Sequence, residues 1–331
     1  MEKTKKFYSI RSLLSHDDFW FYVVIGSRGR GKTFSAQDYF LRQYFNKGTQ
    51  FFIIRLSKLS TQQLLANDAA QLFDSVLMAK YGLNGHLKVG GTQVYYDDQP
   101  LCKVLALSEA AKQKGVAFFD GNYDGWINIL CDEFQREPDE RKTFNVLYGL
   151  TTTLENLCRT RKNKVRIVML ANQLEQANAI LSNWNFLPQK FGRYKLRSKR
   201  AIIDYIEDDP DWVETRRETV AYSLMPTASN FTNIIKYDES LVRKRNPYSK
   251  PYSVIKFSKD SSEWFTVWEG GLISRWRGER KGVIAMTPYL DERFNQSYSK
   301  AVVNSFNARA YHFDTITTQI LFETCLRFIQ K

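Results

Sequence analysis

The sequence predicts an α/β fold: an N-terminal domain with a mostly parallel sheet flanked by helices, followed by a smaller α+β domain. Three observations predict this class. In the first half of the chain, short and nearly continuous apolar segments alternate with segments of helical period, which is typical of a sheet covered on both faces. A glycine-rich loop stands between the first apolar segment and the first helical segment. From Tyr252 the pattern changes to short strands separated by turn residues.

The periodicity also places the individual elements. In the first domain, strands are expected at 19–25, 50–56, 126–131 and 165–170, with strands joined by tight turns within 82–107. Helices are expected at 34–45, 61–80 and 144–156, and the polar segment 108–119 is expected to be a loop facing a ligand or a pore. In the second domain, a β-meander is expected at 253–257, 264–268, 272–276 and 283–286, followed by helices at 291–306 and 315–329.

The glycine-rich loop fits the pattern G-x-x-x-x-G-K-[S/T] of a nucleotide phosphate loop. It consists of Gly26, Ser27, Arg28, Gly29, Arg30, Gly31, Lys32 and Thr33. The N–H groups at the start of a helix cradle phosphate oxygens, Lys32 reaches the β- and γ-phosphates, and the Thr33 hydroxyl ligates Mg²⁺. The alternative is a chance match, but the strand before the loop and the helix after it are the context that the motif requires. ATP and Mg²⁺ are therefore expected.

Asp132 and Glu133 end an apolar strand about a hundred residues after the loop. Asp132 is expected to hold Mg²⁺, and Glu133 to polarise the attacking water as the catalytic carboxylate. The alternative is an exposed carboxylate pair at a strand end. Thr33, Arg55 and Asn172 also stand at or just past the ends of elements that meet at one edge of a parallel sheet. Asn172 either senses the γ-phosphate and positions water, or caps the strand end.

Several arginines are candidates for stabilising the transferred phosphate. Arg159 and Arg161 follow the helix after Glu133 and are candidate arginine fingers for the site of a neighbouring subunit. The alternative is a solvated helix end, which cations also favour. Arg28 and Arg30 either contact phosphate within their own subunit or are exposed.

The charge of the chain indicates a polyanionic partner. The 331 residues include 48 Lys and Arg against 35 Asp and Glu, a formal net charge of +13. Cations cluster at 190–200 and at 243–245, and the candidates in the polar segment are Lys112 and Lys114. A protein that grips DNA by its phosphates needs such cations and no base readout. The alternative for each cluster is a solvated face or a subunit contact.

Other classes of site are not expected. The four cysteines form no C-x-x-C pair and the three histidines lie far apart, so neither a disulfide framework nor a zinc site is expected. No apolar segment has the length of a membrane span, and no secretory signal is expected. The expected domains are 1–197, a linker region at 198–230 and 231–331, since the basic cluster is followed by an acidic run around Pro210.

Together these motifs resemble the DNA-packaging motor ATPases of phi29-type bacteriophages, the genome encapsidation proteins of the ASCE, FtsK–HerA-like P-loop class. The resemblance rests on the phosphate loop, on Phe-Ile-Ile-Arg-x-x-Lys ending at Lys58, on Leu-Cys-Asp-Glu-Phe-x-Arg at 130–136, on Arg159-Thr160-Arg161 and on Met-Leu-Ala-Asn ending at Asn172. It covers the first 175 or so residues in order and spacing. Leu56 stands where the family can have a second Arg, and the segment 108–125 is longer than in relatives.

The resemblance implies roles for named residues. Lys32, Thr33 and Asp132 would bind Mg-ATP, with Glu133 as the catalytic carboxylate and Arg159 as the finger acting on the next subunit. Arg55, Lys58 and Arg161 would lie at the subunit interface, where Arg55 and Lys58 assist nucleotide exchange or hydrolysis. Asn172 would couple the γ-phosphate to movement, and Lys114 would face the DNA channel.

The resemblance also implies a homopentameric ring that threads double-stranded DNA into a preformed prohead. The ring would dock transiently at the portal vertex in the host cytoplasm, contacting the portal or connector and a scaffold RNA, and would be absent from the mature virion. The C-terminal domain would resemble a degenerate RNase H-like nuclease. Two-metal nucleases need converging carboxylates, and the strands 253–257 and 272–276 carry none, so nuclease activity is not expected. The alternatives are a P-loop helicase or recombinase, a small-molecule P-loop kinase and a terminase with an active nuclease.

Overall fold

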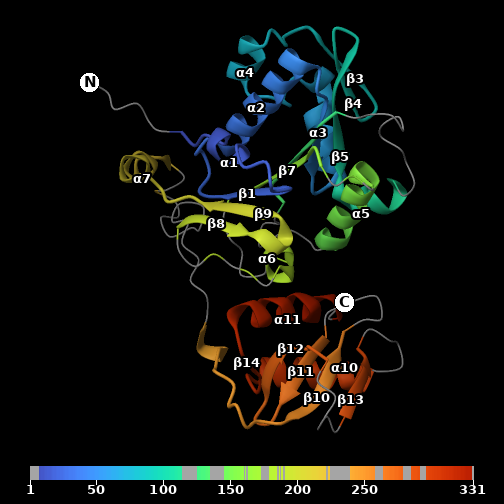
Figure 1. Cartoon of the computed structure of the whole chain (residues 1–331), viewed down its shortest axis with the longest axis vertical. Helices are drawn as coiled ribbons and strands as arrows, with labels where there is room; N and C mark the ends of the chain where they lie inside the picture. Colours follow the sequence, from blue (N-terminus) through green and yellow to red (C-terminus); the bar gives the residue numbers. More distant parts are fainter. Residues whose placement is uncertain are drawn as a thin grey trace. The chain divides into compact units, whose positions relative to one another are not determined.

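The computed structural model describes residues 7–113, 125–134, 145–159, 161, 163–172, 179–184, 186, 188, 191–220, 223, 239–257, 264–278, 285–290 and 296–329 (Figure 1). The chain divides into two compact units. Unit 1 comprises Met1–Glu175 and Pro188–Ile235, and unit 2 comprises Gln176–Leu187 and Lys236–Lys331. The units are therefore not contiguous along the sequence, because a short segment after the seventh strand belongs to unit 2.

Unit 1 is built on a nine-stranded sheet with the order β3-β4-β5-β2-β6-β7-β1-β9-β8. The strands are β1 (Phe21–Ile25), β2 (Phe51–Arg55), β3 (Leu87–Gly90), β4 (Gln93–Tyr96), β5 (Gln99–Ala106), β6 (Ile127–Asp132), β7 (Val165–Ala171), β8 (Gly192–Leu196) and β9 (Ala201–Tyr205). The six central strands from β5 to β9 pair in parallel, and only β3, β4 and β8 run antiparallel to their neighbours. The predicted mostly parallel sheet is confirmed.

The central strands are buried on both faces because consecutive residues are apolar. In β1, Tyr22 and Val24 point into a core shared with the first helices, and Val23 and Ile25 on the opposite face are also fully buried. The helical elements of unit 1 are α1 (Arg11–Leu14), α2 (Lys32–Lys47), α3 (Lys58–Ala69), α4 (Ser75–Lys80), α5 (Val146–Cys158), α7 (Pro210–Arg217) and the short 3₁₀ turns η1 (Leu107–Gln113) and η2 (Arg197–Lys199). Burial on both faces is what a parallel sheet requires.

The single helix expected at 61–80 is wrong, because the segment contains two helices. Asn67 and Asp68 adopt left-handed backbone conformations at the end of α3, which short polar side chains tolerate better than most residues. The Asp74 carboxylate then caps the first turn of α4 by accepting the Val76 N–H. The apolar periodicity continues across the break, so it did not reveal the break.

Unit 2 has a five-stranded mixed sheet with the order β13-β10-β11-β12-β14. Its elements are α6 (Ala179–Asn183), η3 (Glu239–Leu241), β10 (Pro251–Lys256), β11 (Trp264–Trp268), β12 (Leu272–Arg275), β13 (Ala285–Tyr289), α10 (Gln296–Asn307), β14 (His312–Phe313) and α11 (Ile316–Ile329). The first three strands form the expected antiparallel meander. The fourth does not extend it: β13 pairs in parallel with β10 on the other side.

Candidate active site

The phosphate loop connects β1 to α2 at the carboxyl edge of the sheet. Gly29 and Gly31 both have left-handed backbone angles, with φ of 79° and 77°. Gly31 directly precedes the first helical residue, Lys32, and a glycine adopts this conformation without the steric cost of a Cβ atom. The Gly26 N–H donates to the carbonyl of Ala171 at 3.3 Å. The loop is thus held between β1, β7 and the start of α2.

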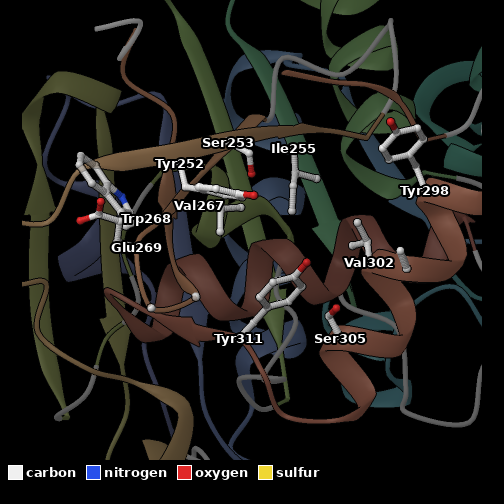
Figure 2. A pocket seen from close by; sticks show the side chains of 13 residues that line it. Tyr252, Ser253, Ile255, Val267, Trp268, Glu269, Tyr298, Val302, Ser305 and Tyr311 are labelled. Atoms are coloured by element: carbon white, nitrogen blue, oxygen red, sulfur yellow. The ribbon is translucent and has the colours of Figure 1, made fainter. Parts of the chain in front are cut away.

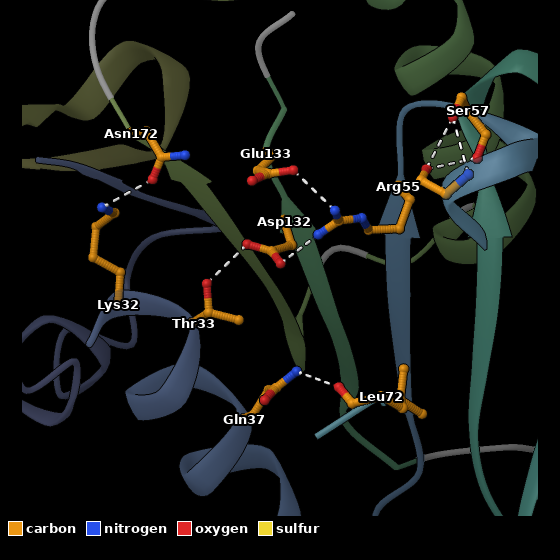
Figure 3. A network of polar contacts seen from close by, with 10 residues as sticks. Lys32, Thr33, Gln37, Arg55, Ser57, Leu72, Asp132, Glu133 and Asn172 are labelled. Carbon is orange, nitrogen blue, oxygen red and sulfur yellow. Dashed lines mark hydrogen bonds and ion pairs between the residues drawn. The ribbon is translucent and has the colours of Figure 1, made fainter. Parts of the chain in front are cut away.

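Lys32 is buried and bends back over its own loop. Its Nζ donates to the carbonyls of Gly26 at 2.8 Å and Ser27 at 2.7 Å. It also lies 3.4 Å from Asn172 Oδ1 (Figure 3). Burial lowers the pKa of the Lys32 ammonium to about 8, against the opposing attraction of Asp132 and Asp208. A phosphate anion bound here would supply the negative charge that this buried cation lacks.

Asp132 and Glu133 are joined by Arg55 into one network (Figure 3). Asp132 accepts a hydrogen bond from the Thr33 hydroxyl at 3.0 Å and pairs with Arg55 at 2.6 Å. The same guanidinium pairs with Glu133 at 2.9 Å. Burial raises the pKa of Asp132, while Arg55 and the Thr33 hydrogen bond act in the opposite direction. The structure therefore brings together all five residues expected at the sheet edge, including Asn172 through Lys32.

The oxygen atoms of this network fit a magnesium ion. Mg²⁺ prefers oxygen ligands and is usually held by one or two protein groups together with substrate phosphates. The Thr33 hydroxyl and the Asp132 carboxylate, which touch each other at 3.0 Å, supply such a donor pair next to the phosphate loop. Glu133 lies one residue beyond the strand with a left-handed φ of 55°, and nearly half of its side chain is exposed.

Asp208 is a site residue that sequence reasoning missed. It follows β9 and accepts a hydrogen bond from the Ser27 hydroxyl at 2.5 Å, while Arg30 Nε lies 3.7 Å from the same carboxylate. Both charged side chains are about 10% exposed. The signal was available, because Ala201–Tyr205 is an apolar strand whose carboxyl end reaches the same edge. By its composition alone, the acidic run at 207–211 indicates only a domain boundary.

The two arginines of the loop differ in their surroundings. Arg30 is 9% exposed, and its Nε makes no hydrogen bond within the described part of the chain. Its neighbour Asp208 therefore compensates a buried charge. Arg28 is exposed, so it is accessible from solvent at the surface of the loop.

Arg159 and Arg161 lie near the amino ends of the central strands, whereas the phosphate loop lies at their carboxyl ends. Arg161 donates to the carbonyl of Gly125, just before β6, at 2.8 Å, and the Ile127 N–H donates to the Lys164 carbonyl at the amino ends of β6 and β7. Arg159 ends α5 and is exposed, with no ion pair among the described residues. Strands of this length span about 20 Å, so Arg159 does not reach the site of its own subunit.

Lys58 and Lys112 share one carboxylate. Both ammonium groups lie 3.3 Å from Glu109 Oε1, and both side chains are more than half exposed. Lys112 belongs to η1, so the described part of the expected loop is a 3₁₀ turn. Lys114, expected to face DNA, lies outside the described residues.

Unit 2 has a cavity of about 530 Å³ between the sheet and α10 (Figure 2). Its lining is mainly aromatic and aliphatic, with Tyr252, Trp268, Tyr298 and Tyr311 among the side chains. Its carboxylate, Glu269, accepts the backbone N–H of Lys250 at 3.2 Å. Within the described parts of both units, no cluster of three or more His, Cys, Asp or Glu side chains is placed to hold a metal. No described helix is long and apolar enough to cross a membrane.

Comparison with known proteins gives concordant matches. The family described as podovirus DNA encapsidation protein (Gp16) matches residues 1–307. The DNA packaging protein of Bacillus phage phi29 is 26% identical over 295 residues, covering 88% of this chain and 80% of that protein. The DNA packaging protein of Bacillus phage PZA is 28% identical over 216 residues, covering 64% and 60%.

Two solved structures share the fold over nearly the whole chain. The Phi-28 gp11 DNA packaging motor has a TM-score of 0.69 at 16% identity and covers 97% of this chain and 98% of that one. The phi29 viral genome packaging motor assembly has a TM-score of 0.64 at 20% identity, covering 98% and 100%. At these identities the structural similarity establishes the fold alone. The evidence for a family relationship comes from the sequence matches.

Proposed function

The chain belongs to the podovirus DNA encapsidation protein (Gp16) family, and on that premise we propose that ATP hydrolysis at the β1–α2 loop drives double-stranded DNA into a preformed prohead. It is a DNA-packaging motor protein of the phi29 type. The observation that carries the enzymatic part of the proposal is the network of Thr33, Asp132, Arg55 and Glu133 beside Lys32. These are the parts that phosphoryl transfer to water requires.

Each side chain of the site has a distinct role in this proposal. The loop N–H groups and Lys32 bind the β- and γ-phosphates, while Thr33 and Asp132 hold Mg²⁺, which supplies charge neutralisation when bound. Glu133 accepts a proton from the attacking water. Asn172 lies 3.4 Å from Lys32 Nζ at the end of β7. It contacts the γ-phosphate and couples its presence to movement of β7. Asp208 holds Ser27 and Arg30 and thereby positions the loop.

Arg55 positions the two carboxylates in this proposal. Its guanidinium pairs with Asp132 and Glu133 at once, so it fixes the Glu133 side chain relative to the metal ligand. A role in nucleotide exchange at the subunit interface, as the family resemblance implies, is compatible with this position. Release of Glu133 from Arg55 would free the carboxylate to accept a hydrogen bond and then a proton from the attacking water.

We propose that the finger comes from the next subunit of a homo-oligomeric ring. Arg159 is exposed and stands at the edge of the sheet remote from its own phosphate loop, which supports action in trans. The resemblance implies a homopentamer, with Lys58 and Arg161 at the interface. An arginine finger contributes on the order of 10³–10⁵ in rate.

The second domain is proposed to be a vestigial nuclease-like module that meets DNA, the portal and a scaffold RNA. Strands β10, β11 and β12 contain no Asp or Glu, which supports the absence of nuclease activity because two-metal cleavage needs converging carboxylates. The domain limits 1–197, 198–230 and 231–331 remain proposals. So do the transient docking at the portal vertex in the host cytoplasm and the absence from the virion.

The Glu133→Gln variant tests the site. We expect it to bind ATP with unchanged affinity and to lose turnover by at least about 10³-fold, since the amide cannot accept the proton. Glu155→Gln, an exposed carboxylate on α5, is the matched control and should hydrolyse ATP normally. An unchanged rate of ATP hydrolysis by Glu133→Gln would show that Glu133 is not the catalytic base. A helicase is the second reading, and ATP-driven separation of a forked duplex would favour it.

A further inference from the structure

The β8–β9 hairpin concentrates positive charge on β8, the last strand of the sheet of unit 1, and on the η2 turn that follows it. Between residues 193 and 200, five of eight residues are cationic and none is acidic: Arg193, Lys195, Arg197, Lys199 and Arg200. All five are exposed. The partner strand β9, in contrast, is buried along its whole length. The charges therefore lie on the exposed surface of an edge strand and of the turn that follows it. Figure 1 shows the backbone of β8 beside β9.

Two of the five cations contact a partner within the protein, and the other three pair with no acidic side chain in the described part of the chain. Arg193 pairs with the buried Asp204, with Nε at 2.6 Å from Oδ1, and Arg200 lies over the Trp20 ring at 4.4 Å. Lys195, Arg197 and Lys199 make no ion pair among the described residues. Three uncompensated cations within five residues repel one another unless an anion binds, so this set is costly for a purely structural role.

The position of these three cations excludes their own nucleotide as the anion. The carbonyl of Arg200 accepts the N–H groups of Trp20 and Phe21, immediately before and at the start of β1. The phosphate loop follows the other end of the same strand. The turn that carries Arg197 and Lys199 is therefore about 17 Å from the loop, the length of a five-residue strand.

We propose that Lys195, Arg197 and Lys199 form a contact for the phosphodiester backbone of a double-stranded nucleic acid. This inference rests on the proposed function, because a motor that moves along a duplex needs contacts that ignore base sequence. Lysine is depleted at protein–protein interfaces, which favours nucleic acid over an acidic protein. A packaged DNA and a structural RNA present the same phosphates, and the experiment separates them.

The test is the binding of the full chain to a fluorescent 30-base-pair duplex at a series of salt concentrations. One arm uses DNA and the other uses RNA of the same sequence. The triple variant Lys195→Gln, Arg197→Gln, Lys199→Gln should lose at least about tenfold in affinity. Its slope of log K against log salt should become shallower by about 2 to 3, since each phosphate contact contributes about 0.9. Loss in the DNA arm, the RNA arm or both identifies the duplex that the hairpin contacts.

Two further variants control for net charge and folding. Lys47→Gln, Lys300→Gln, Arg309→Gln removes three exposed cations elsewhere and should leave the affinity within about twofold. The swap Lys195→Arg, Arg197→Lys, Lys199→Arg keeps the charges and should bind like the unmodified chain. Equal losses in the two charge-removing variants, or no loss in either duplex arm, would overturn the proposal. So would unchanged duplex binding with weakened self-association, which would indicate an acidic neighbouring subunit.

The ATPase rate in the absence of nucleic acid separates this proposal from the proposed function. The triple variant Lys195→Gln, Arg197→Gln, Lys199→Gln should hydrolyse ATP at the basal rate. Its three substitutions lie near the amino end of β1, and the phosphate loop follows the carboxyl end of that strand. If the unmodified chain does not hydrolyse ATP, the proposed function fails. The duplex-binding comparison would still show whether Lys195, Arg197 and Lys199 contact nucleic acid.

Discussion

At the scale of single residues, the site contains charged side chains whose free energy is raised by burial. Lys32 illustrates this, because within the described part of the chain its ammonium donates to the neutral carbonyls of Gly26 and Ser27, and burial lowers its pKa to about 8 from the usual 10.5. A lowered lysine pKa means that the folded state binds fewer protons than the unfolded state between these two values. Folding is therefore favoured as pH rises through this window, and the contribution is lost as pH falls through about 8.

The same shift predicts proton uptake on nucleotide binding. At pH 8.5 about three-quarters of the Lys32 side chains are neutral for a pKa of about 8, and bound phosphates should restore the charged form. Calorimetry with ADP and EDTA in buffers of different ionisation enthalpy should give an uptake of up to about 0.7 proton at pH 8.5. Lys32→Arg, whose charge is permanent, should take up none. An equal uptake by both proteins would show that another group titrates.

Asp208 should affect nucleotide binding more than chemistry. Its carboxylate accepts a hydrogen bond from Ser27 and compensates the charge of Arg30, and no hydrogen bond or ion pair between described residues joins it to Glu133. We expect Asp208→Ala to raise the KM for ATP about tenfold, a loss of about 1.4 kcal/mol, with a smaller change in kcat. Glu207→Ala, an exposed neighbour, should behave like the unmodified enzyme. A change confined to kcat would assign Asp208 to the chemical step instead.

At the scale of elements, the position of α5 relative to η1 depends on Gly149. A Cβ atom at Gly149 would lie 2.9 Å from the carbonyl oxygen of Leu107, and backbone cannot move aside as a flexible side chain can. Alanine usually stabilises a helix over glycine by about 1 kcal/mol, whereas overpacking costs about 1–3 kcal/mol. We therefore expect Gly149→Ala to lower the free energy of unfolding by about 1 kcal/mol.

Urea denaturation monitored by circular dichroism measures this effect. Thr151→Ala, at an exposed position on the same helix, is the control and should be neutral or slightly stabilising. A stabilised Gly149→Ala protein would mean that α5 and η1 do not pack as closely as the structure has them.

The elements also show how far sequence reasoning reaches. The alternation of apolar strands and helices was sufficient for the α/β class and for placing Thr33, Asp132 and Glu133 at one edge, because parallel strands share their carboxyl ends. It did not reveal the break at Asn67–Asp68, where local side-chain chemistry overrides the apolar period. Nor did it reveal that Arg55 pairs with both carboxylates or that Asp208 supports the loop. Those contacts join strands distant in sequence, and no local pattern encodes which partners meet.

At the scale of the whole molecule, the account predicts that each active site is shared by two subunits. Chains carrying Glu133→Gln lack the base, and chains carrying Arg159→Ala lack the finger, so each is inactive alone. A mixture should regain ATPase activity, because some interfaces combine an intact Glu133 with an intact Arg159 from the neighbour. Titrating one variant into the other measures this. No recovery at any ratio would show that Arg159 does not act in the site of a neighbouring subunit.

The central claim is that hydrolysis at this site moves DNA into a prohead. The most direct measurement is protection of linear double-stranded DNA from added nuclease, using matching proheads, the full chain and ATP. We expect genome-length protected DNA with the unmodified chain and none with Glu133→Gln or with a non-hydrolysable ATP analogue. Protection that is equal with and without hydrolysis, or ATP turnover that never protects DNA, would contradict the account.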